Sequence, residues 1–157
     1  MRIIFEKSVT LNWTKENFTI STDKSWLDIT YIHDYLSNKS YWAENIPLDI
    51  VRKSIEGSIC FGIYHNLQQI GFARVITDKA CFAYLADVFI DEHYRGLGLS
   101  KWLMEVIISF PDLQGLRRFL LATRDAHGLY EQFGFSVLTF PEKWMHIHNP
   151  NPYKPKS

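Results

Sequence analysis

The sequence predicts one α+β (mixed α/β) domain organised around a β-sheet. Its 157 residues match the size of one ordinary domain. Its composition, with 46% hydrophobic and 15% aromatic residues, supplies a sizeable core and excludes a disordered protein. Its hydrophobic periodicities run from strand to two helices, then to a meander of strands, and then to alternating strands and helices.

The first part of the chain has the patterns of strands followed by two helices. The opening residues 1–7 and the segment 18–22 are predicted to be strands. A helix is expected from Ser25, which can cap its first turn and has an acidic residue three positions later. A second helix is expected from Pro47 to Gly57, because proline suits a first helical turn and glycine commonly ends a helix.

The rest of the chain alternates between the two periods. The helix over 99–110 has the cleanest pattern, with apolar residues at i, i+3, i+4, i+7, i+8 and i+11. The other predicted elements are strands at 59–64, 70–76, 81–90 and 119–123, a short helix at 126–133, and closing strands at 135–140 and 144–148. Residues 1–148 are therefore expected to form a single domain, and residues 149–157, with three of the six prolines, an exposed tail.

Charge and cysteine content exclude several classes of protein. Lys plus Arg and Asp plus Glu both number 17, and zero net charge disfavours general nucleic-acid binding while leaving room for a pocket that takes one small anion. No apolar run reaches the roughly 18 residues of a membrane span, and a charge comes too early for a signal peptide. We expect a cytoplasmic protein with no membrane partner. Cys60 and Cys81 lie in apolar runs without zinc spacing, so we expect both to be buried and no metal to be bound.

The most informative junction spans residues 88–100, where a strand enters a glycine-containing turn that opens into the best helix. Gly96 and Gly98 allow the backbone to approach a ligand closely. The first helical turn leaves N–H donors free and Arg95 adds a forked cation, so the junction suits a pyrophosphate. A structural turn is the usual role of a lone Gly-x-Gly, and neither the P-loop nor the full Rossmann spacing is present.

Two stretches resemble motifs of the GCN5-related N-acetyltransferase (GNAT) family. Residues 95–100, Arg-x-x-Gly-x-Ser, resemble its Gln/Arg-x-x-Gly-x-Gly/Ala motif, with serine in the last small position. Residues 126–135 are similar to its late Ala-x-x-x-Tyr-x-x-x-Gly-Phe signature. The element order fits from about 18 to 148. The resemblance implies a GNAT-like, mostly antiparallel twisted sheet, flanked by about four helices and splayed at an acetyl-CoA site.

The resemblance also implies a binding site for the co-substrate acetyl-CoA. In the family the loop motif binds the pyrophosphate, and a backbone N–H of the preceding splayed strand stabilises the thioester oxygen. By position this role falls to Val88, with Ile90 helping to hold the pantetheine arm. Thr123 stands where many relatives carry Asn; it keeps a hydroxyl but lacks the amide with which Asn contacts the cofactor arm. The implied cofactor-binding residues are Val88, Ile90, Arg95, Gly96, Leu97, Gly98, Leu99, Ser100 and Thr123.

The implied reaction is direct transfer of the acetyl group to an amine of a small molecule or peptide, with no acyl-enzyme. Tyr130 matches the family's general acid, and an ordinary phenol, with a pKa of about 10, is protonated at neutral pH. Asp87, a lone carboxylate in an apolar strand, is the first candidate for the base, because burial there would raise its pKa. His127 is the second candidate. The competing interpretations are a packing tyrosine, a surface or capping aspartate and an exposed loop histidine.

The acceptor side is the least defined. In the family the first two helices and their connection shape it, and Tyr31, Tyr35, Tyr41 and Trp42 fall there. An aromatic patch can hold an amine by cation–π contact, and core packing is the equally good alternative. A non-catalytic acyl-CoA-binding or sensing module stays open as a second function, and the oligomeric state, a homodimer included, is not determined by the sequence.

Overall fold

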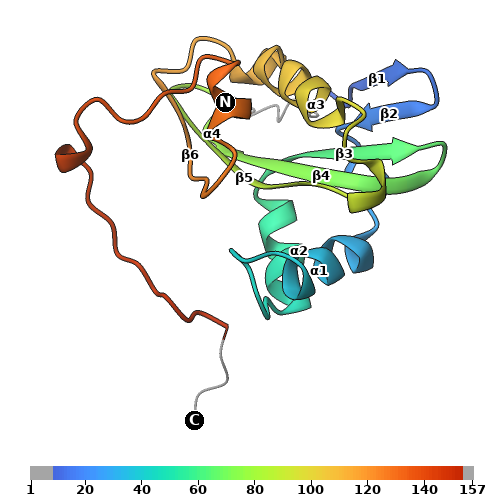
Figure 1. Ribbon diagram of the computed structural model, residues 1–157, viewed down its shortest axis with the longest axis horizontal. Coiled ribbons are helices and arrows are strands. Elements are labelled where there is room, and N and C mark those ends of the chain that lie inside the picture. Colours follow the sequence, from blue (N-terminus) through green and yellow to red (C-terminus); the bar gives the residue numbers. More distant parts are fainter. Residues whose placement is uncertain (1–8, 154–157) are drawn as a thin grey trace, which may run out of the picture.

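The computed structural model describes residues 9–153, which form a six-stranded sheet with helices on both faces (Figure 1). The strand order is β1-β2-β3-β4-β5-β6; neighbours are antiparallel except β5 and β6, which are parallel. The strands are β1 (Asn12–Lys15), β2 (Phe18–Ser21), β3 (Ile59–His65), β4 (Gln68–Thr77), β5 (Phe82–Ile90) and β6 (Arg118–Leu121); the helices are α1 (Ile29–Asn38), α2 (Leu48–Glu56), α3 (Leu99–Ile108) and α4 (His127–Glu131). The predicted mixed, mostly antiparallel fold is confirmed.

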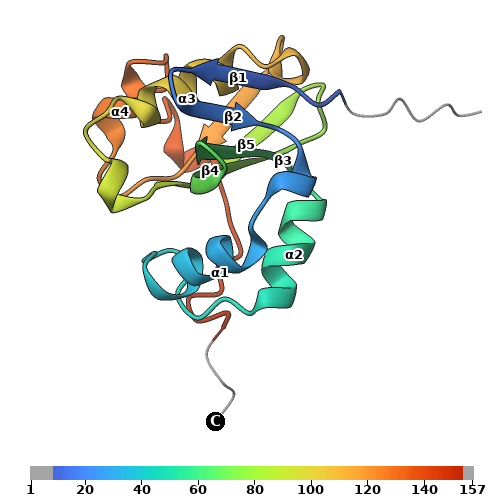
Figure 2. The ribbon, with the colours of Figure 1, turned by 90° about the vertical axis from the view of Figure 1, so that its right-hand side faces the viewer.

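The sheet separates two hydrophobic cores. Side chains alternate between the faces of a strand, so neighbouring residues of β3 and β4 enter different cores. Phe61 and Val75 pack on the side of α3 and α4, whereas Cys60 and Phe72 pack on the side of α1 and α2. Figure 2 shows the two helical layers above and below the strands. A residue at the junction of β5 and β6 can therefore be reached from both layers.

The helices follow the sequence pattern with one displaced start. The helix predicted from Ser25 begins at Ile29 instead, capped by Asp28, whose carboxylate accepts from the Tyr31 N–H. Ser25 lies in a short 3-10 turn, and the following Leu27 is extended, which breaks the helical hydrogen-bond ladder. Helix α2 follows Pro47 and ends at Gly57, as predicted. Among residues 9–153 no helix has the length and apolarity to cross a membrane.

The two ends of the chain differ from the prediction. The expected strand at 1–7 lies outside the described residues, and β1 over 12–15 was not predicted. The predicted closing strands at 135–140 and 144–148 are wrong: both segments are coil, and a 3-10 turn at Pro141–Lys143 lies between them. Their apolar pattern is that of strands, but a strand forms only by pairing, and this segment runs away from the sheet (Figure 1).

The two cysteines do not share an environment. Cys60 is buried, as expected. Cys81 is exposed, which corrects the prediction, because it belongs to the turn before β5 and not to the strand itself. Its Sγ donates to the Asp78 carboxylate at 2.9 Å. The Asp78 carboxylate also accepts backbone N–H groups of this turn and so holds it together.

Gly71 is required by packing. It lies in β4 opposite Ile63 and Ile90, and a Cβ there would lie 2.8 Å from the Phe89 carbonyl oxygen. We expect Gly71→Ala to lower the free energy of unfolding by roughly 1–3 kcal/mol, because that oxygen belongs to the neighbouring strand. Gly128→Ala is the control, since a Cβ on this α4 residue has nothing within 4 Å and alanine favours helix by up to about 1 kcal/mol. Denaturant unfolding measures both, and equal midpoints would contradict the packing argument.

Candidate functional site

Strands β5 and β6 part from each other halfway along β5. Their pairing ends at Leu85 and Leu121, but β5 continues to Ile90. Residues 86–90 therefore have β4 on one side and no β6 partner on the other. This is the splay that the family resemblance implied. It leaves backbone donors and acceptors of two strand ends available to a ligand that enters between them.

A β-bulge lies at the start of the splay. The pairing of β4 with β5 passes from Phe72 opposite Phe89 to Arg74 opposite Ala86, so Asp87 and Val88 together occupy one position of the register. Asp87 has a positive φ of 54°, which is uncommon for a residue other than glycine. The extra residue shifts the alternation of β5. It places Asp87 on the α1/α2 side, while Val88 packs against the core under α3.

The glycine turn lies beyond the end of β5 and opens into α3. Gly96 and Gly98 have φ values of 78° and 75°, the left-handed region that favours glycine, and a Cβ on either would have open space around it. Gly98 is the N-cap, and the first helical bond runs from the Trp102 N–H to its carbonyl. The N–H groups of residues 99–101 precede that bond and have no partner within the helix. Leu99 is buried and anchors the helix start, whereas Leu97 is 58% exposed.

Arg95 connects this turn to α1. Its guanidinium donates to the Tyr35 hydroxyl at 3.2 Å and, through Nε, to the Ile90 carbonyl at 3.4 Å. The Tyr35 ring is stacked on Phe89, with centroids 3.7 Å apart and an angle of 4° between the planes. Tyr31 packs against the same ring at 5.9 Å. Two of the four predicted acceptor residues therefore form the core beneath the turn.

The other two predicted acceptor residues, Tyr41 and Trp42, are exposed on the connection between α1 and α2. The Trp42 indole N–H donates to Asp87 Oδ1 at 2.9 Å. The Tyr41 hydroxyl accepts from the Arg124 backbone N–H, and the Arg124 guanidinium lies 3.8 Å from the centre of the Tyr41 ring. This connection therefore touches both sides of the splay, the bulge of β5 and the loop after β6.

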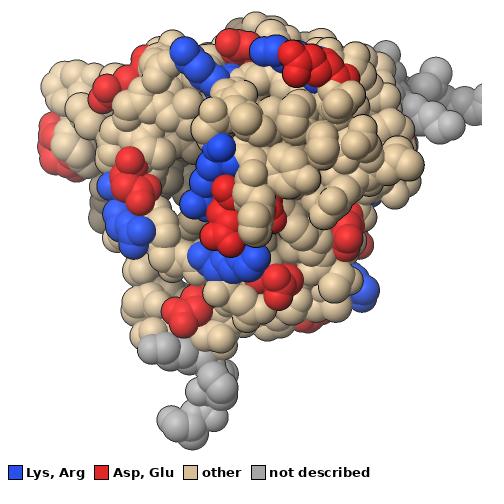
Figure 3. Space-filling view, turned by 45° about the vertical axis from the view of Figure 1, so that its right-hand side comes forward, with Lys and Arg blue, Asp and Glu red and all other residues tan. Residues whose placement is uncertain are grey.

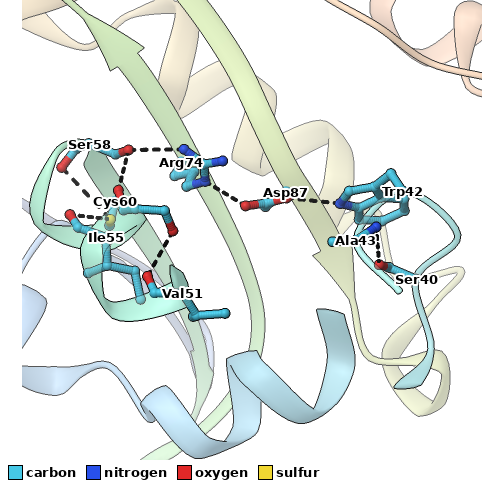
Figure 4. Close-up of polar contacts among 10 residues, drawn as sticks. Ser40, Trp42, Ala43, Val51, Ile55, Ser58, Cys60, Arg74 and Asp87 are labelled. Atoms are coloured by element: carbon cyan, nitrogen blue, oxygen red, sulfur yellow. Dashed lines mark hydrogen bonds and ion pairs between the residues drawn. The ribbon is translucent and has the colours of Figure 1, made fainter. Parts of the chain in front are cut away.

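Asp87 is not the lone carboxylate that the sequence suggested. Its Oδ2 accepts from Arg74 Nε at 2.5 Å, and the two side chains are 8% and 16% exposed. Arg74 also donates to the Ser58 hydroxyl, which completes a chain of contacts from Ser58 to Trp42 (Figure 4). Sequence reasoning missed Arg74 because only the bulged register of β4 and β5 brings it beside Asp87.

The second motif lies on the other side of the splay. Tyr130 is buried in α4, and burial raises its pKa above the ordinary value, with Tyr41 and Asp125 adding to the shift, so the phenol keeps its proton. The Thr123 hydroxyl accepts from the Ala126 N–H at 3.0 Å, so it holds the turn that leads into α4. His127 is exposed at the first position of that helix.

Neither cysteine has the surroundings of a nucleophile. Burial raises the pKa of Cys60 to about 11, so it is a thiol at neutral pH. The neighbouring Asp78 raises the pKa of the exposed Cys81 as well. Within the described part of the chain no three His, Cys, Asp or Glu side chains gather as metal ligands would. In Figure 3 lysines and arginines are interspersed with acidic residues over the visible face.

Comparison with known proteins places these features in a family. The model of the acetyltransferase (GNAT) domain matches residues 56–137. A protein of Gibberella zeae assigned as an acetyltransferase is 32% identical, and the match covers 76% of this chain and 78% of that protein. The residues matched by the family model include the bulge of β5 and the glycine turn.

Solved structures agree with that placement. A Xanthomonas campestris protein assigned to the GNAT family is 50% identical, with a TM-score of 0.86, and the match covers 88% of this chain and 97% of that one. A GNAT acetyltransferase of Elizabethkingia anophelis, solved with acetyl-CoA bound, has a TM-score of 0.59 at 15% identity and covers 87% of this chain and 91% of its own. This second likeness concerns the fold.

The buried pair of Asp87 and Arg74 makes a prediction about stability. Arg74→Met leaves the carboxylate buried without its partner, and we expect a loss of about 3 kcal/mol in the free energy of unfolding. The double variant Arg74→Met/Asp87→Asn should recover much of this loss. The matched control is the exposed pair of Lys79 and Asp112, at 3.5 Å, where Lys79→Met should cost less than about 1 kcal/mol. Denaturant unfolding of these variants and of Asp87→Asn alone measures the coupling, and additive single effects would contradict it.

Proposed function

The chain belongs to the GNAT acetyltransferase family, and from this premise we propose that it transfers the acetyl group of acetyl-CoA directly to an amine of a small molecule or peptide. One observation carries the proposal. The open glycine turn, with free N–H groups at the start of α3, stands at the end of β5, the strand that parts from β6. The gap between the two strands is followed by a turn that can bind an anion. This order suits a ligand with a pyrophosphate and a long, narrow amide arm.

The residues present fit such a ligand. A Cβ added at Gly96 or Gly98 would project into open space, so these positions have room for phosphate oxygens against the backbone. The N–H groups of residues 99–101 supply donors at the positive end of the helix dipole. Arg95 contributes positive charge beside the turn, and its hydrogen bond to Tyr35 fixes its direction. The free edge of residues 86–90 offers peptide groups to the amides of a pantetheine arm.

The chemistry supplied by acetyl-CoA is a thioester whose carbonyl an amine can attack. In this proposal the backbone N–H of Val88, beside the bulge, donates to the carbonyl oxygen where negative charge develops. Tyr130 donates its proton to the departing sulfur. Its raised pKa keeps the phenol protonated at neutral pH, where a free thiol of pKa about 8.5 is also the stable form. Each residue thus stabilises one of the two sites that gain charge.

Asp87 is proposed to receive the amine's proton. Each of its oxygens already accepts one hydrogen bond, from Trp42 and from Arg74, and each keeps a second lone pair. The bond to Asp87 fixes the Trp42 indole, whose ring packs edge-to-face against Tyr41. In this proposal the two rings form the wall beside the amine. His127, exposed at the start of α4, is the second candidate for the base.

A non-catalytic acyl-CoA-binding module is the competing function. The specific observation that favours it is the ion pair of Asp87 with Arg74, since the guanidinium already occupies one oxygen of the proposed base. Incubation with acetyl-CoA and a panel of amines, with free thiol as the readout, separates the two functions. Thiol release that depends on an amine supports transfer.

Binding of CoA is the first consequence to test. At about 100 times its Kd, CoA should raise the melting temperature by roughly 5–10 °C. Gly98→Val should abolish this shift, because its side chain fills the space above the turn. Valine also strains a positive φ, so the control is Gly115→Val, at a φ of 70° in open space before β6. That variant should lose similar stability and keep the CoA shift. Equal shifts in both variants would remove the turn from the binding site.

Tyr130→Phe tests the general acid. It removes the hydroxyl and keeps the ring, so we expect kcat to fall roughly 100- to 10,000-fold with little change in CoA affinity. The control is Tyr64→Phe, another buried tyrosine, whose hydroxyl has no hydrogen-bond partner among the described residues. It should leave kcat unchanged. Because the pKa of Tyr130 is raised, the loss of activity caused by its deprotonation should occur above the ordinary phenol value of about 10. Near-normal kcat in Tyr130→Phe, with chemistry rate-limiting, would assign Tyr130 to packing.

A further inference from the structure

The ring of Tyr41, half of the aromatic wall, already has a cation on its face. The Arg124 guanidinium lies 3.8 Å from the centre of this ring, which is a cation–π contact. The same residue donates its backbone N–H to the Tyr41 hydroxyl at 3.2 Å, so two contacts join the pair. The face of Tyr41 that an ammonium could have used is therefore taken by the protein's own charge, which repels a second cation there.

Arg124 stands at the open end of the splay. It follows β6, whose pairing with β5 ends at Leu121, and its side chain is 65% exposed. The Tyr41 ring beneath it meets the Trp42 ring edge-to-face, with centroids 5.1 Å apart. On the far side the Trp42 indole donates to Asp87 (Figure 4). The wall thus has a carboxylate at one end and a guanidinium at the other, and only two rings separate them.

The guanidinium of Arg124 keeps donors for a ligand. In the described chain its ion pair is with Asp125, which one terminal nitrogen contacts at 3.5 Å, and both side chains are about two-thirds exposed. Exposed pairs of this kind contribute little, because water competes for both partners. The other N–H groups form the fork with which arginine binds carboxylate and phosphate groups. An anion can therefore bind Arg124 while the ring contact stays in place.

The same contacts place this charge beside the proposed general acid. Besides burial, the groups that raise the pKa of Tyr130 are Tyr41 and Asp125, the two side chains that also hold the Arg124 guanidinium. An amine between Asp87 and Tyr130 would then have Arg124 within reach of a second group on the same small molecule. The two ring distances correspond to a spacer of a few carbon atoms.

We propose that Arg124 binds an anionic group of the acceptor, so that the substrates are small amines with a carboxylate or a phosphate a few bonds from the nitrogen. This inference rests on the proposed function and names its acceptor class. The acetyl carbon passes from sulfur to the amine nitrogen, whose proton goes to Asp87, while the sulfur takes the proton of Tyr130. Arg124 exchanges no proton and determines specificity. Polyamines and lysine-rich peptides are disfavoured, since their second ammonium would face the guanidinium.

Paired acceptors test this assignment, with thiol release from acetyl-CoA as the readout. Glycine, β-alanine, γ-aminobutyrate and ε-aminocaproate are each compared with the alkylamine that lacks the carboxyl group, and phosphoethanolamine with ethylamine. The best acceptor should be anionic, and its head group distinguishes carboxylate from phosphate. Arg124→Gln should lower its kcat/KM about tenfold and leave its neutral partner within about twofold, because a charge-assisted hydrogen bond is lost. Comparing variants on one acceptor removes differences in amine pKa.

Two further variants separate a local contact from the overall charge. Arg117→Gln removes the same charge from an exposed arginine just before β6, at the opposite end of that strand from Arg124. It should leave both members of each pair unchanged. Arg124→Glu should reverse the preference, so that putrescine becomes a better acceptor than the amino acids. CoA should raise the melting temperature of Arg124→Gln as much as that of the wild type.

The outcomes distinguish this inference from the proposed function. If the wild type prefers alkylamines, or if Arg124→Gln slows both members of a pair equally, Arg124 does not select the acceptor, and acetyl transfer stands without it. Loss of the CoA shift in Arg124→Gln would assign the guanidinium to the cofactor and overturn the inference as well. No thiol release with any amine would overturn the proposed function itself, and the acceptor class with it.

Discussion

The parting of β5 from β6 is the constraint on which the rest of this structure depends. A sheet that stayed paired to its end would have no opening, and its peptide groups would be satisfied within the protein. Here the parallel pairing stops at Leu85 and Leu121, and the bulge at Asp87 turns the remaining strand. The glycine turn then directs the chain into α3. The end of the pairing, the bulge and the turn follow one another between Leu85 and Gly98, which is why so short a stretch determines the site.

The bulge also attaches the α1/α2 layer to the sheet. Asp87 lies in a strand, yet its hydrogen bonds reach Arg74 on the neighbouring strand and Trp42 on the connection between α1 and α2. Arg95 makes the second link, from the turn before α3 to Tyr35 in α1. Charged and polar groups therefore hold together helical layers that lie on opposite faces of the sheet. Such contacts are directional, so they fix the relative position of the layers more closely than apolar packing alone.

Local signals gave the parts of the fold that local chemistry determines. The period of 99–110 and the glycines before it predicted α3 and its open turn, and Pro47 and Gly57 bounded α2. Contacts between distant residues could not be predicted. The pairing of Arg74 with Asp87, for example, depends on a bulge that no periodicity marks. Two neighbouring capping residues can compete, and Asp28 prevailed over Ser25. The segment 135–148 failed as sheet for a different reason, since its pattern specifies a strand but not the neighbour it needs.

The connection between α1 and α2 has a property that bears on how such proteins diversify. It is attached to the sheet by side chains, through Trp42 on Asp87 and Tyr41 on Arg124, and takes no part in strand pairing. Insertions or replacements there would change the wall beside the splay while leaving every strand register intact. The scaffold that holds the glycine turn and the surface beside the splay can thus change independently of each other.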